Sequence, residues 1–161
     1  MLRNTILRFF LVPFSALTLN SFAGTIYWVN NGGNWNDTKH WSRTSGGNGG
    51  AGIPASTDDV VFDENSFSVP NQQVTITGSA ICHGLFWMHE AIYATLSGST
   101  LSNIDIYGSV NIEAAVNFKY LGSVHFKATQ PGNVINMNIG KLNNIYFDGA
   151  GSWKLASLLF A

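Results

Sequence analysis

The stretch "LSNIDIYG", residues 101–108, returns 41 positions later as "LNNIYFDG", residues 142–149. Leu, Asn, Ile and Gly keep their places in both copies, and an aromatic residue replaces Ile106. Similarity at a fixed spacing indicates stacked structural units, and this spacing suits two coils of about 20 residues each. Such repeats tolerate degeneracy because each coil contacts only its neighbours. The pair therefore predicts a β-solenoid.

Apolar residues alternate with other residues through most of the chain after residue 24. A period of two places every second side chain on one face of a strand, and the Gly, Asn and Ser residues between the runs are typical of turns. No segment of ten residues shows a helical stripe, so the fold class is all-β, with a β-sandwich as the alternative. The alternating positions are Tyr27 and Val29, Val60 and Phe62, Val74 and Ile76, Ile92, Ala94 and Leu96, Ile104 and Ile106, Val110 and Ile112, Val116, Phe118 and Tyr120, Val124 and Phe126, Ile135, Met137 and Ile139, Ile145 and Phe147, and Trp153 and Leu155.

A second, shorter pattern is Gly-Ser-apolar-polar-apolar, which occurs at residues 108–112, 122–126 and 151–155. Inward side chains of a solenoid stack on like side chains, and asparagines at its bends can form hydrogen-bonded ladders. Asn103 and Asn144 suit that role, and the alternative is that their amides bind sugar.

Residues 1–23 have the pattern of a secretory signal peptide. An apolar run over residues 9–19 follows two arginines, and the small residues Ser21 and Ala23 lie just before Gly24. This pattern predicts cleavage after Ala23, and the run is too short to cross a bilayer as a mature helix. We therefore expect a secreted or cell-surface protein.

Cleavage there removes two of the eight basic residues and none of the nine acidic ones, which leaves a net charge of −3. The remaining Lys and Arg residues are scattered, so the sequence predicts no binding to nucleic acid and no basic membrane patch. The single cysteine, Cys82, excludes an internal disulfide. It lies in an apolar run, where we expect it to be a core residue.

Residues 24–70 are predicted to form an N-terminal cap and the first strands, and residues 71–161 the solenoid coils. A solenoid must cover its exposed strand edges. We expect Trp28, Trp35 and Trp41 to fold over the first coil, with turns at the glycines of residues 46–52.

The same opening segment carries four acids, Asp58, Asp59, Asp63 and Glu64. Clustered oxygen ligands are typical of calcium sites, so calcium is the one cofactor considered for this chain. The competing interpretation is turn chemistry, since no glycine-spaced calcium loop is present.

Exposed aromatic rings on a β-face are the candidates for stacking on sugars, and they are Trp87, Tyr93, Tyr107 and Tyr146. His125 is expected to point outward. The acids Glu90, Asp105, Glu113 and Asp148 are dispersed, so the sequence places no two carboxylates face to face, as glycoside cleavage requires. No compact zinc motif and no serine-hydrolase elbow occurs.

The chain resembles the opening region of large, mostly uncharacterised surface proteins from type IX-secreting bacteria. The resemblance rests on the segments at residues 34–37, 40–42, 46–54 and 58–63, and on "CHGLFW", "IYGSV" and "FDGAGSWKL" downstream. It implies a surface location and a right-handed parallel β-helix. Members of this group run much longer and end in a sorting domain, so the chain is expected to be truncated at its C-terminus.

These observations predict a structural or adhesin-like surface module without catalytic activity. Its expected partners are an extracellular polysaccharide or the surface of a host or neighbouring cell. The alternative is the N-terminal part of an enzyme that binds or cleaves polysaccharide. Because no capping segment follows Trp153, we also expect self-association through an uncapped C-terminal edge.

Overall fold

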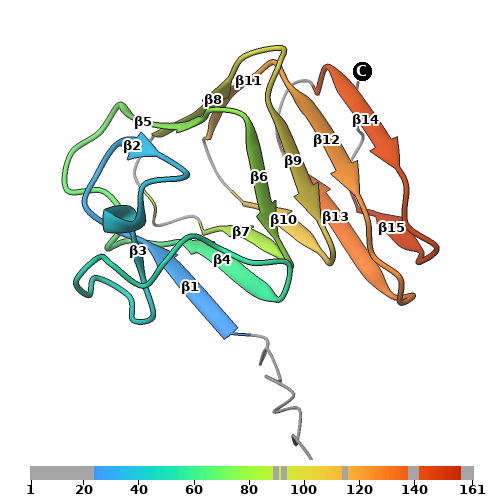
Figure 1. Cartoon of the computed structure of the whole chain (residues 1–161), viewed down its shortest axis with the longest axis horizontal. Coiled ribbons are helices and arrows are strands. Elements are labelled where there is room, and N and C mark those ends of the chain that lie inside the picture. The colour runs from blue at the N-terminus through green and yellow to red at the C-terminus, as the bar shows by residue number, and fades with distance from the viewer. Residues whose placement is uncertain (1–23, 89–90, 92–93, 114–115, 138–141, 157–161) are drawn as a thin grey trace, which may run out of the picture.

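The strands of this chain stack into a parallel β-solenoid (Figure 1). This computed structural model describes residues 24–88, 91, 94–113, 116–137 and 142–156. Helical structure among them is limited to the 3₁₀ turn η1, Thr38–His40. The predicted all-β solenoid is confirmed, and the sandwich alternative is wrong because neighbouring strands pair in parallel, except β1 with β3. No helix in the described part of the chain is long and apolar enough to cross a membrane.

Sheet A contains seven strands in the order β15-β13-β10-β7-β4-β1-β3. Their bounds are β1 Gly24–Trp28, β3 Trp41–Ser42, β4 Asp58–Phe62, β7 Leu85–Trp87, β10 Val110–Ile112, β13 Asn133–Met137 and β15 Trp153–Leu155.

Sheets B and C contain four strands each, in the orders β11-β8-β5-β2 and β14-β12-β9-β6. Sheet B is built from β2 Gly33–Asn34, β5 Gln72–Ile76, β8 Ala94–Gly98 and β11 Asn117–Tyr120. Sheet C is built from β6 Ser79–Cys82, β9 Asn103–Ile106, β12 Ser123–Phe126 and β14 Asn144–Phe147.

The register of sheet C confirms the sequence repeat. Asn103 of β9 pairs with Ser123 of β12, which pairs with Asn144 of β14. The two copies of the repeat therefore lie two coils apart, as predicted. In sheet A the spacing is longer, because Val60, Leu85, Val110 and Ile135 are successive partners 25 residues apart.

The Gly-Ser units do not mark equivalent positions of successive coils. The apolar residues that follow them belong to sheet A at Val110 and Trp153 but to sheet C at Val124. The pattern is therefore a common entry into a strand. Asn103 and Asn144 are likewise separated by Ser123, so they form no direct ladder. The asparagine pair that does bond between neighbouring strands is Asn136 Nδ2 to Asn111 Oδ1, at 2.8 Å.

The core fills the interior of the solenoid with side chains from every second strand position. Phe62, Trp87, Ile112 and Met137 are successive Cα partners in sheet A, and all four are buried. Cys82 belongs to this core, as predicted. Burial raises the pKa of its thiol, so the group is held in the uncharged form, which is a poor nucleophile.

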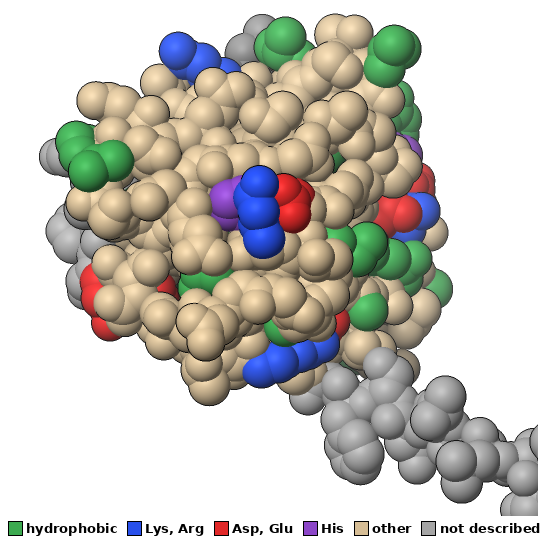
Figure 2. Space-filling view, turned by 60° about the vertical axis from the view of Figure 1, so that its left-hand side comes forward, with side chains coloured by type: hydrophobic (Ala, Val, Ile, Leu, Met, Phe, Trp, Pro, Cys, Tyr) green, Lys and Arg blue, Asp and Glu red, His purple; other side chains and the backbone are tan. Residues whose placement is uncertain are grey.

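The N-terminal end is closed by an aromatic cluster. Trp28, Trp35 and Trp41 are at most 1% exposed and pack on one another and on Phe62, as predicted. Trp41 Nε1 donates to the carbonyl of Trp35, and Trp28 Nε1 to that of Asn31, each at 2.6 Å, so these two buried indole N–H groups are satisfied. Figure 2, which brings this end forward, shows mostly neutral polar and backbone atoms with small separate hydrophobic patches.

The turns of this segment use residues that tolerate a left-handed backbone. Gly46, Gly50 and Gly52 have φ values of 64°, 108° and 90°, a region that side chains with a Cβ rarely adopt. The segment ends at β4, which pairs in parallel with one edge of β1. Strand β3 pairs antiparallel with the other edge of β1. The edge of sheet A is thereby paired at Tyr27 and Trp28.

Candidate functional site

The outer face of sheet C gathers most of the titratable side chains that the solenoid coils carry. We call it the sheet C face, and its strands are β6, β9, β12 and β14 in Figure 1. Alternation turns apolar residues such as Ile104 and Phe126 inward and leaves polar ones outward. The outward residues are Ser79, Ile81, Asn103, Asp105, Ser123, His125, Asn144 and Tyr146, followed at the strand ends by His83, Tyr107, Lys127 and Asp148.

Lys127 and Asp105 form the ion pair at the centre of the sheet C face. Lys127 Nζ lies 2.7 Å from Asp105 Oδ2, and Asn103 Nδ2 donates to the other carboxylate oxygen at 3.2 Å. Ser79 then donates to Asn103 at 2.8 Å. The hydrogen bond to Asp105 raises the pKa of Lys127 against the opposing effect of burial. The lysine is therefore charged at neutral pH and its charge is already partnered.

His125 joins two residues of the next strand. Its Nδ1 lies 2.5 Å from Asp148 Oδ2, and its ring stacks on that of Tyr146 with centroids 4.6 Å apart and planes 13° from parallel. His125 and Tyr146 are direct Cα partners in β12 and β14, so backbone pairing alone brings the two rings side by side. His125 points outward, as predicted.

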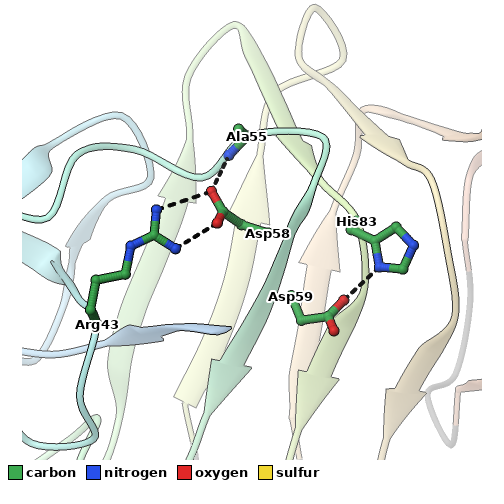
Figure 3. Close-up of polar contacts among 5 residues, drawn as sticks. All are labelled: Arg43, Ala55, Asp58, Asp59 and His83. Carbon is green, nitrogen blue, oxygen red and sulfur yellow. Dashed lines mark hydrogen bonds and ion pairs between the residues drawn. The ribbon is translucent and has the colours of Figure 1, made fainter. Parts of the chain in front are cut away.

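A second acid–imidazole pair lies at the edge of the same face. His83 Nδ1 is 2.7 Å from Asp59 Oδ1 (Figure 3), and both side chains are more than one-third exposed. A Cβ on Gly108 would lie 2.9 Å from the His83 ring, so the glycine permits this close approach. An exposed pair of this kind contributes little to stability.

Asp58 points to the opposite side of β4 from Asp59 (Figure 3). Its carboxylate accepts from Arg43 Nη1 at 2.5 Å and from the backbone N–H of Ala55 at 2.9 Å, and its side chain is 5% exposed. These contacts tie the glycine-rich loop to the first full strand. Asp58 is therefore a structural residue of the cap.

The four predicted calcium ligands do not converge on one point. Asp58 and Asp59 face opposite sides of their strand, and Asp63 accepts from the backbone N–H of Asn65 in a local turn. Glu64 is exposed. Within the described residues, no group of three or more His, Cys, Asp or Glu side chains is placed to hold a metal ion. The geometry gives no support to calcium binding by this set.

The four aromatic residues predicted to stack on sugars lie in different environments. Trp87 is wrong as a surface residue, because it is fully buried and its ring lies 3.9 Å from that of Phe62. Tyr93 lies outside the described residues. Tyr107 is half-buried at the end of β9, on the outward side. Tyr146 is 46% exposed on the sheet C face, which leaves it as the aromatic ring best placed for a ligand.

The sequence shows Asp105 and Asp148 as dispersed single acids and does not reveal that both are bound by side chains at β12, His125 and Lys127. A signal for this grouping was present, since the 41-residue offset aligns Asp105 with Tyr146 and Tyr107 with Asp148. His125 and Lys127 fall on the strand between them. The full register of three strands was needed to bring these residues together.

The chain was also compared with known proteins. No family model matches it, and neither a curated protein nor a solved structure does.

Proposed function

We propose that this protein is a secreted or cell-surface β-solenoid module that binds glycan, without cleaving it, through the sheet C face. The observation that carries the proposal is the Tyr146 ring, which is 46% exposed and held parallel to His125. A sugar ring offers an apolar C–H face rimmed by hydroxyl groups. A fixed aromatic ring surrounded by carboxylate and amide groups matches both parts of that ligand.

The fixed position of Tyr146 favours binding over a chance exposed tyrosine. The ring is supported on one side by His125, whose own orientation is set by Asp148. A side chain already held in place loses less conformational entropy when a ligand docks. Asn144 lies two residues earlier on the same strand face and is exposed, so its amide is available to hydroxyl groups.

The proposal of a non-catalytic role is supported by how the two carboxylates of this face are placed. Asp105 belongs to β9 and Asp148 directly follows β14, with β12 between them. Asp105 is bound by Lys127, which directly follows β12, and Asp148 is bound by His125 of β12. Glycoside cleavage needs two carboxylates that face each other across the scissile bond. Here both are engaged within the sheet.

The surface location is proposed from the leader-like residues 1–23, together with the resemblance to surface proteins of type IX-secreting bacteria. Those residues lie outside the described structure. A glycan-binding face is consistent with an adhesin-like role at a cell surface, where an extracellular polysaccharide is the partner.

The test uses the chain from Gly24 to Ala161 and a panel of soluble and insoluble polysaccharides. We expect retention on at least one polysaccharide in affinity electrophoresis or pull-down, with no release of reducing or unsaturated sugars. Tyr146→Ala should abolish retention, and Tyr146→Phe should preserve it. Tyr27→Ala, an outward tyrosine of β1 in sheet A, is the matched control and should bind normally.

Failure to bind any polysaccharide would contradict the proposal. So would binding that survives Tyr146→Ala in a variant that keeps the circular dichroism spectrum of the wild type. Sugar release that depends on Asp105 or Asp148 would instead favour the alternative of a polysaccharide-cleaving protein.

A further inference from the structure

We infer that the sheet C face selects an uncharged glycan and rejects acidic polysaccharides such as uronates. This inference rests on the proposed function, because it names the ligand class of the same site. It is carried by the pairing of the charged groups around Tyr146 and by the hydrogen-bonding capacity that the face leaves free.

Every described basic side chain of this face is bound to a carboxylate. Lys127 is bound to Asp105, His125 to Asp148, and His83 to Asp59 at the edge of the face. Among the described residues of the sheet C face, Lys127 is the one Lys or Arg. An acidic ligand approaching Tyr146 therefore meets the Asp148 carboxylate and finds no unpaired cation among the described residues of the face, which disfavours association.

The single lysine is not free to bind an acidic sugar. Its ammonium group is 2.7 Å from the Asp105 carboxylate, and that contact raises the lysine pKa. A uronate that recruits Lys127 must displace Asp105 and leave a partly buried carboxylate, 19% exposed, without its cation. Removing one partner from such a pair is costly.

The free hydrogen-bonding capacity near Tyr146 is mainly acceptor capacity. His125 is bound to Oδ2 of Asp148, no described residue donates to Oδ1, and the side chain is 43% exposed. An ionised carboxylate only accepts hydrogen bonds, so it requires a ligand that donates them. Sugar hydroxyls supply such donors, whereas the carboxylate of a uronate supplies none and is repelled by the carboxylate of Asp148.

His125 connects the two parts of the site. His125 bonds Asp148 through one ring nitrogen and supports Tyr146 with its ring face. The Asp148 carboxylate and the Tyr146 ring are therefore held in a fixed position relative to each other. We expect a sugar ring stacked on Tyr146 to direct its rim hydroxyls toward Asp148, which suits a neutral pyranose with hydroxyl donors on one edge.

The experiment compares neutral polysaccharides (mixed-linkage β-glucan, galactomannan and xylan) with acidic ones (polygalacturonate and alginate). The chain from Gly24 to Ala161 is used, at two salt concentrations, with and without calcium. We expect the wild type to bind a neutral polysaccharide with little dependence on salt, because no ion pair forms with the ligand. Binding to the acidic polymers should be at least tenfold weaker.

Two variants test the reason for this selectivity. Asp148→Asn removes the charged acceptor and should weaken neutral-glycan binding about tenfold, because hydrogen bonds to ionised groups are roughly twice as strong as neutral ones. Asp105→Asn frees Lys127 and should confer measurable, salt-sensitive binding to polygalacturonate. Asn117→Ala, an exposed residue of β11 on sheet B, is the control and should change neither property.

The outcomes separate this inference from the proposed function. Tight binding of an acidic polymer that is lost in Tyr146→Ala would overturn the inference and leave glycan binding standing. Acidic binding that appears only with calcium would do the same. A wild type that binds no polymer of either class would overturn both.

Discussion

The rings of His125 and Tyr146 lie parallel, 4.6 Å apart, on neighbouring strands of sheet C. Because each residue is the direct Cα partner of the other, the contact is set by backbone register and needs no loop to form it. A stacked pair on a β-sheet surface contributes roughly 0.2–1 kcal/mol. Its main effect is to hold Tyr146 in one orientation for a ligand.

His125 is thus a positioning residue for Tyr146. We expect His125→Ala to weaken glycan binding five- to tenfold while changing the unfolding free energy by less than about 1 kcal/mol. His125→Phe keeps a ring under Tyr146 and should restore most of the affinity, although it cannot bond Asp148. Equal loss of affinity in the two variants would show that the Asp148 contact, and not the ring stack, matters.

The aromatic cap should dominate the stability of the N-terminal end. Trp41 is fully buried between Trp28 and Trp35, so Trp41→Ala should lower the unfolding free energy by roughly 3–5 kcal/mol. Urea unfolding measures this change. Leu101→Ala, at a side chain that is 91% exposed, is the control and should stay within about 0.5 kcal/mol of the wild type.

The two neighbouring acids of β4 should behave differently when removed. Asp58→Ala deletes a buried acceptor for Arg43 and Ala55 and should cost about 1–3 kcal/mol of stability. Asp59→Ala breaks an exposed pair with His83 and should cost less than about 1 kcal/mol. Equal costs would contradict the assignment of Asp58 to the cap, and neither change should affect glycan binding.

The buried thiol of Cys82 should make the protein less stable at alkaline pH. Burial raises its pKa in the folded chain above the ordinary value of 9.0. Above about pH 9 the unfolded chain therefore loses a proton that the folded chain keeps, and this contribution lowers the unfolding free energy by about 1.4 kcal/mol per pH unit. Cys82→Ala should remove this contribution to the pH dependence of the unfolding free energy. Denaturation measured at a series of pH values between 8 and 10.5 checks this. An unchanged slope would show that the thiol is accessible.

Self-association through the last strands of sheets A and C remains a prediction, and pairing along β14 would compete with a glycan for the free face of Tyr146. Phe147 and Leu155 occupy inward positions of β14 and β15 yet are 51% and 53% exposed. Sedimentation of the chain from Gly24 to Ala161 should show dimers or larger species at micromolar concentration. Leu155→Lys should shift the population to monomer, whereas Leu101→Lys should not. A wild type that is monomeric throughout would contradict this prediction.

Much of the fold could be predicted because the local pattern and the repeat agree. The copies at residues 101–108 and 142–149 specify two coils, and the tryptophans of residues 28–41 specify a cap. Alternation failed where hydrophobic residues are adjacent along a strand. In β1, Ile26 and Trp28 point inward and Tyr27 outward, the reverse of the predicted phase.

Trp87 illustrates the same limit for the candidate site. It lies in the run Leu85–Trp87, where all three residues are hydrophobic, so the sequence does not say which side chains face the core. Trp87 stacks on Phe62, its Cα partner 25 residues earlier in β4, and this contact places the Trp87 side chain in the core. The ion pairs of the sheet C face depend in the same way on partners about 20 residues apart, which no local pattern identifies.

The most direct test of the central claim is to map a bound neutral glycan on the ¹⁵N-labelled chain by amide chemical-shift perturbation. If the sheet C face is the binding site, the largest shifts will fall on β12 and β14, around His125, Asn144 and Tyr146, and saturate with the measured affinity. Shifts centred on the cap, or on the outer faces of sheets A and B, would contradict the assignment.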